Sequence, residues 1–181
     1  GTLMSGNTFG AIRYSDGKAI VRMLPQFPQI SKCSDCNCIF WLNEDTHIDL
    51  PDGKRSNEAK FLSLNEYFES LDKSIYSSKE EEIYIRQHVL WLYNDRVRQG
   101  KQLFLDENDE QRWKQNLYDL ENILDAEDAN SKLLVIEINR NLGNFDKCKY
   151  LLGEVDDHDL NWVVEKFTEE IEKKNTFVVQ L

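Results

Sequence analysis

Three of the four cysteines of the chain lie within residues 33–38, which read CSDCNC. Thiolates are ligands that a structural zinc ion prefers, and Cys-x2-Cys is a spacing with which one turn supplies two of them. A β-prone aromatic run, residues 39–42, follows at once. The segment is therefore typical of one half of a zinc-ribbon or rubredoxin-like knuckle.

A tetrahedral zinc site needs four ligands, and the sequence contains no second Cys-x2-Cys pair. Cys33 and Cys36 are the first two candidate ligands. The candidates for the remaining positions are Cys38, which begins a predicted strand, and His47, which lies in a predicted loop. Cys148 is interpreted instead as a buried residue at a helix crossing, since free cysteine is often buried. The sequence favours a protein without a cofactor, with zinc as the alternative.

A thiol–disulfide function is the second chemistry that Cys33 and Cys36 could support. Such a motif is reactive where a helix N-terminus or a cation stabilises the thiolate. Here the motif precedes a predicted strand, and the carboxylate of Asp35 inside it disfavours the thiolate. The βαβ frame of thioredoxin-like proteins is also absent from the pattern. Redox exchange is therefore less favoured than metal binding.

Other chemical signals have structural interpretations. The acidic residues of segment 156–159 (DDHD) directly precede a predicted helix, where aspartate caps the free N–H groups. His88 lies in an apolar helical segment and is expected to be a core histidine. No nucleophile elbow, phosphate-binding glycine loop or His-Glu-x-x-His motif occurs. The sequence leans away from an enzyme, although a site assembled from distant residues stays open.

Composition narrows the choice of partners. The chain has 181 residues, of which 40% are hydrophobic, and a net charge of −11. Because such a chain repels phosphate backbones, nucleic-acid binding is not expected. No apolar run approaches the length of a membrane span, so no membrane partner is expected. Clustered free cysteines suit a reducing cytoplasm. Residues 1–32 carry a net charge of +3, so this segment could contact the acidic remainder or an anionic partner.

The cysteines belong to a predicted β-rich segment. Residues 15–17 (SDG) separate two β-prone runs, 11–14 and 18–24, and predict a hairpin, since glycine accepts a positive φ. Residues 38–42 are expected to form a third strand, and residues 43–57 a polar loop.

Helical patterns fill the chain from residue 63 onward. Capping boxes are predicted at Ser63 and Ser78, and a weaker one at Asn108. Apolar residues repeat at helical spacing in the segments after these caps. The expected helices are 64–75, 79–98, 109–125, 130–142, 145–153 and 159–173. The tail 176–181 is expected to form a short strand or a packed end.

One helix pair resembles a tetratricopeptide repeat. In residues 142–148 (LGNFDKC), Gly143, Phe145 and Cys148 match the turn that lets the paired helices of such a repeat cross closely. The match covers about 30 residues, and no second good copy occurs. Because a solenoid needs about three repeats, the pair is interpreted as part of a compact bundle.

The N-terminal third resembles an uncharacterised family of bacterial proteins with a Cys-x2-Cys knuckle followed by helices. The matching segments are residues 5–10, 15–18, 23–25, 33–36 and 40–41. The knuckle departs from the usual Cys-Pro-x-Cys-Gly pattern, because Ser34 and Asn37 replace proline and glycine. Asn37 still tolerates the left-handed backbone that the turn needs. The resemblance implies no activity.

The sequence thus predicts an α+β fold. Residues 1–60 form a small knuckle-bearing β unit, which is docked on an α-helical body, residues 61–181, with one tetratricopeptide-like pair. The predicted function is a cytoplasmic, non-enzymatic interaction or adaptor module with a protein partner. The alternative is a zinc- or thiol-based sensor that uses Cys33, Cys36 and Cys38.

Overall fold

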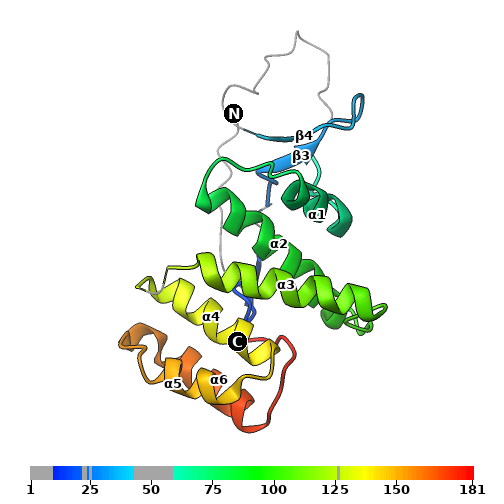
Figure 1. The fold of residues 1–181 in the computed structure, drawn as a ribbon. Coiled ribbons are helices and arrows are strands. Elements are labelled where there is room, and N and C mark those ends of the chain that lie inside the picture. The colour runs from blue at the N-terminus through cyan, green and yellow to red at the C-terminus, as the bar shows by residue number, and fades with distance from the viewer. Residues whose placement is uncertain (1–9, 22–23, 25, 43–58, 126) are drawn as a thin grey trace.

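The computed structural model describes residues 10–21, 24, 26–42, 59–125 and 127–181. These residues form a mixed α+β fold with six α-helices and two antiparallel sheets of two strands each. The helices follow one another in chain order across the molecule, from α1 beside the β3–β4 sheet to α5 and α6 at the opposite end (Figure 1).

Both sheets are short hairpins. β1 (Ile12–Arg13) pairs with β2 (Ala19–Ile20), and β3 (Ile30–Lys32) pairs with β4 (Ile39–Trp41). The predicted hairpin around residues 15–17 and the strand after the cysteines are confirmed. The strands of the first hairpin are two residues long, so they are shorter than the runs 11–14 and 18–24 predicted.

The first three helices begin at side-chain caps. α1 (Leu64–Asp72) starts with the predicted capping box at Ser63, and α2 (Lys79–Arg98) starts at Ser78, which accepts a hydrogen bond from the backbone N–H of Glu81. The capping box predicted at Asn108 is wrong, because α3 (Glu107–Ile123) has Asp106 as its N-cap. Asp106 accepts a hydrogen bond from the backbone N–H of Asp109 at 2.8 Å, and its charge suits the positive end of the helix dipole.

The second half contains α4 (Ala129–Asn141), α5 (Phe145–Leu152) and α6 (Asn161–Glu172). A single 3₁₀ turn, η2 (His158–Leu160), precedes α6 where the sequence predicted one continuous helix. Asp157 caps this turn by accepting from the backbone N–H of Asp159, which confirms the capping interpretation of the acidic segment. The tail has one isolated bridge, from Tyr14 to Gln180.

Helix α4 is shared between two hydrophobic cores. Leu134 and Ile138 join the first core, which is built on α1, α2 and α3 and also receives Ile30 of β3. Ile136 faces the second core, which joins α4 to α5 and α6. Because Ile136 lies on the opposite face of α4 from Leu134 and Ile138, two faces of this helix are buried in different cores.

Candidate functional site

The turn of the first hairpin is buried, which is unusual for a loop tip. Ser15 and Asp16 are 5% and 0% exposed, and Gly17 follows with a φ of 79° that a residue with a Cβ seldom adopts. Buried polar groups need hydrogen-bond partners, and this turn finds them on two helices and on the C-terminal tail. The hairpin tip is thereby fixed against the helical body.

Asp16 anchors the turn to α2. Its backbone carbonyl accepts from Trp91 Nε1 at 2.9 Å, and its carboxylate accepts from Asn94 Nδ2 at 2.9 Å. Arg98 forms an ion pair with the same carboxylate, and its guanidinium carbon lies 4.3 Å from the centre of the Tyr14 ring. The charge of Asp16 is therefore compensated inside the protein.

Ser15 anchors the turn to α4 and to the tail. Its hydroxyl donates to Glu137 Oε1 at 2.9 Å and accepts from the backbone N–H of Val179 at 3.1 Å. Glu137 and Arg140 are both 0% exposed and form an ion pair of 2.7 Å. Burial raises the pKa of Glu137, whereas Arg140 and Ser15 act in the opposite direction. Ser15, Glu137 and Arg140 are called the buried network below.

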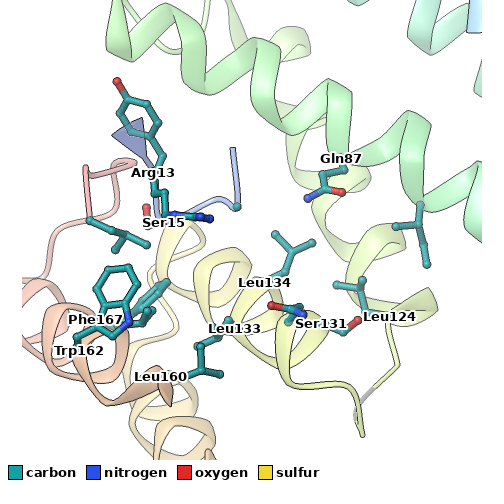
Figure 2. Close-up of a pocket in the computed structure, with 16 residues that line it drawn as sticks. Arg13, Ser15, Gln87, Leu124, Ser131, Leu133, Leu134, Leu160, Trp162 and Phe167 are labelled. Atoms are coloured by element: carbon teal, nitrogen blue, oxygen red, sulfur yellow. The ribbon is translucent and has the colours of Figure 1, made fainter. Parts of the chain in front are cut away.

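A groove of about 400 Å³ lies beside this anchored turn, between the hairpin, α2, α4 and α6. Figure 2 shows the hairpin residues Arg13 and Ser15 on one side, Gln87 on another, and the α4 and α6 side chains below. Most of the lining is apolar. The apolar side chains that line it are Ile83, Leu124, Leu133, Leu134, Leu160, Trp162, Val163, Phe167 and Leu181.

Two residues at the groove are available to a partner. Trp162 lies in the first turn of α6, and its exposed fraction of 49% is large for a tryptophan. Arg13 is exposed, and its guanidinium makes no ion pair or hydrogen bond with any residue in the described ranges. Apart from Arg13, the polar side chains described along the groove are uncharged, among them Gln87 and Ser131. Within the part of the chain that the structure describes, the groove thus combines an apolar floor with the positive charge of Arg13, which has no acidic side-chain partner there.

The predicted metal ligands lie elsewhere. Cys33, Cys36 and Cys38 occupy the turn between β3 and β4, where Cys36 and Cys38 are exposed and all three thiols are free. The predicted tight turn is confirmed: Asn37 has a φ of 60°, and its N–H donates to the Cys33 carbonyl at 3.0 Å. His47 lies outside the described residues. Within those residues no three His, Cys, Asp or Glu side chains gather closely enough to hold a metal, so the four-ligand site stays a prediction.

Cys148 and His88 have structural surroundings. Cys148 is 0% exposed and donates to the Ile136 carbonyl at 3.4 Å, and burial raises the pKa of its thiol to about 12. Its predicted burial is confirmed. His88 packs between aromatic rings, with the Tyr84 ring centre 4.0 Å away, and burial lowers the pKa of His88 to about 4. Neither residue lines the groove.

The groove residues were not singled out from sequence. Arg13, Gln87, Ser131 and Trp162 come from four elements far apart in the chain, and no local spacing connects them. The sequence indicates the buried network more clearly than it indicates the groove. Glu137 and Arg140 stand one helical turn apart in a helix with apolar residues on both sides, a pattern that indicates a buried ion pair.

The chain matches no protein-family model, and neither a curated protein nor a solved structure matches it. No helix in the described part of the chain is long and apolar enough to cross a bilayer.

Proposed function

We propose that the chain is a cytoplasmic, non-enzymatic interaction module whose groove binds an aliphatic protein segment that carries a carboxylate. The observation that carries this proposal is the uncompensated Arg13 beside an apolar groove. A partner that covers the groove removes apolar surface from water and places its own acidic side chain against Arg13.

The character of the groove residues supports binding. Tryptophan and arginine are the residue types that most often dominate binding energy at protein interfaces. Trp162 supplies a large ring that is half exposed on a stable helix, and Arg13 is held on a hairpin that the buried network fixes in place. A pre-organised surface of this kind loses little conformational entropy on binding.

The charge of the whole chain decides which partner chemistry fits. At −11 the protein repels polyanions such as nucleic acids over long distances. Arg13 is a local positive charge on this negatively charged protein. It can pair with a single carboxylate in a partner segment that is otherwise apolar. The side chains described along the groove include no carboxylate, histidine or cysteine, so general acid–base chemistry has no support at this place.

The same proposal includes the finer organisation of the fold. We take residues 1–60 as a unit docked on the helical body, and α4 with α5 as its tetratricopeptide-like pair. Contacts that favour docking are the Lys18–Asp95 ion pair of 2.6 Å and the hydrogen bond of 2.8 Å from Trp41 Nε1 to the Ile75 carbonyl. The close approach of Cys148 to α4 favours the helix pair.

The test is a random-peptide selection against the full chain, followed by calorimetric titration of an enriched peptide. We expect enriched peptides to combine aliphatic residues with at least one aspartate or glutamate. Arg13→Glu and Trp162→Ala should each weaken binding by about tenfold or more, since both residue types are frequent hot spots. Tyr150→Ala is the matched control, because Tyr150 is 67% exposed and lies away from the groove. Enriched peptides that bind both groove variants as tightly as the wild type would refute the proposal.

A sensor based on the cysteines is a second candidate function. The observation in its favour is that Cys33, Cys36 and Cys38 share one turn and are all at least partly exposed. Zinc would hold its thiolates at about 2.3 Å and would take its fourth ligand from another residue such as His47. Elemental analysis of the purified chain, with a free-thiol count, tests this candidate. One zinc per chain with three thiols protected would support the zinc-based form of this sensor, and no zinc with four reactive thiols in the unfolded chain would exclude that form.

A further inference from the structure

A second cleft, of about 880 Å³, lies on a different part of the molecule from the groove. It is formed where the C-terminal end of α2 and the loop after it meet α3, the end of α4 and the tail. Its apolar lining includes Val97, Leu103, Phe104, Trp113, Leu142 and Phe177. A cleft of this size with several aromatic walls is typical of a site for a small molecule. We call it the aromatic cleft.

Two residues of the aromatic cleft have unsatisfied hydrogen-bonding atoms. Trp113 is 3% exposed and Asn141 is 6% exposed. Trp113 Nε1 and Asn141 Oδ1 are buried and have no hydrogen-bond partner among the described residues. Buried polar atoms in native proteins are nearly always paired, so an orphaned pair at one cleft needs an explanation. The first atom can only donate and the second can only accept.

The orientation of the Asn141 amide is fixed by its other contacts. Its Nδ2 donates to Glu137 Oε1 at 3.1 Å and to the Thr176 carbonyl at 3.1 Å. These two acceptors require the amide nitrogen on that side, so Oδ1 is the free acceptor. The Trp113 indole is held by Phe104, whose ring centre is 5.0 Å away in an edge-to-face arrangement. The unsatisfied donor and acceptor are therefore held in place by their surroundings.

We propose that the aromatic cleft binds a small planar aromatic carboxamide. Its carbonyl accepts from Trp113 Nε1, its N–H donates to Asn141 Oδ1, and its ring packs between Phe104 and Phe177. An amide offers both an acceptor for Trp113 Nε1 and a donor for Asn141 Oδ1, whereas a carboxylate offers no donor to Asn141. The segments 100–104 and 175–177 contain no helix or strand, and Phe177 is 50% exposed. Access of a flat ring to the buried atoms then rests on movement of the half-exposed Phe177 side chain, since Phe104 and the Thr176 carbonyl hold Trp113 and Asn141 in place.

The experiment uses the full chain and the probe benzamide, followed by ¹H–¹⁵N correlation spectra. The indole N–H signal of Trp113 is assigned with the Trp113→Phe variant, which removes the donor and retains a ring. We expect this signal to move saturably, with a dissociation constant on the order of 1–10 mM for so small a ligand. Trp113→Phe should weaken binding about tenfold, as followed at the backbone amide of Phe177.

Matched controls decide between this proposal and its alternatives. Cyclohexanecarboxamide has the same amide without an aromatic ring, and it should bind at least about fivefold more weakly. Trp162→Phe, in the groove, should leave benzamide binding unchanged. If Trp113→Phe does not fold, Phe177→Ala replaces it, because Phe177 is half exposed and its loss should also weaken binding. An indole signal that stays in place at about 20 mM benzamide, or that responds equally to both probes, overturns the proposal.

Discussion

Replacing Glu137 with glutamine removes the negative charge of the buried network and retains the shape of the side chain. In the wild-type protein, Glu137 accepts hydrogen bonds from Ser15, Arg140 and Asn141, and it is 0% exposed. The amide of glutamine would present N–H groups to the guanidinium, so one interaction becomes repulsive. Arg140 would then be a buried cation without a counter-charge.

The loss of the counter-charge to Arg140 sets the expected decrease in the free energy of unfolding. Removing one member of a buried ion pair destabilises a protein by about 3–5 kcal/mol, mostly because the remaining charge is left uncompensated. With a urea dependence of about 2 kcal/mol per molar, the unfolding midpoint of Glu137→Gln should fall by roughly 2 M. The double variant Glu137→Leu/Arg140→Met removes both charges, so it should recover much of the lost free energy.

Urea unfolding followed by circular dichroism measures these differences. Glu169→Gln is the control, because Glu169 also pairs with a lysine but is 60% exposed, and such pairs contribute about 0–1 kcal/mol. A midpoint for Glu137→Gln within error of the wild type would show that the charge of Glu137 is not needed. A double variant that is less stable than Glu137→Gln would show that the network is worth more than an apolar replacement, contrary to the reasoning.

Three further predictions concern other parts of the chain. Because burial lowers the pKa of His88 to about 4, below the unfolded value of about 6.5, the folded state binds fewer protons between these values. Lowering the pH from 7.5 to 5 should therefore cost about 2 kcal/mol more in the wild type than in His88→Leu, measured by urea unfolding at both pH values. Cys148→Leu should overpack the α4–α5 crossing and cost about 1–3 kcal/mol in the same assay, and an unchanged midpoint would contradict the tight packing there. A fragment that ends near residue 52 should give a collapsed amide spectrum with or without zinc, and a dispersed spectrum in either condition would refute its dependence on the helices.

The helices could be predicted from sequence because their signals are local. Ser63 and Ser78 mark the starts of α1 and α2, and apolar residues at helical spacing mark the later turns of each helix. α2 was predicted with the bounds that the structure gives. The cap of α3 was misplaced by two residues, since Asp106 and Asn108 are both suitable capping residues and only their side-chain geometry separates them.

The sites could not be predicted in the same way. No segment that lines the groove has a distinctive motif of its own, and only the packing of the hairpin against α2 and α4 brings Arg13 and Trp162 to the same groove. The cysteine turn, unlike the groove, has a recognisable sequence motif. Its spacing is conspicuous in the sequence, yet the structure places no three potential ligands together within the described residues. A local pattern can predict a turn, but it cannot predict which groups the turn faces.

Glu137 connects the two candidate sites physically. Its Oε1 atom accepts from Ser15, which lines the groove, and from Asn141, which lines the aromatic cleft. Both bonds converge on one carboxylate within α4, the helix shared by the two cores. Loss of the Glu137 charge should therefore loosen the hairpin that carries Arg13 and also release the amide that orients Asn141 Oδ1. A substitution at this one position is expected to weaken binding at both places, although Glu137 lines neither the groove nor the cleft.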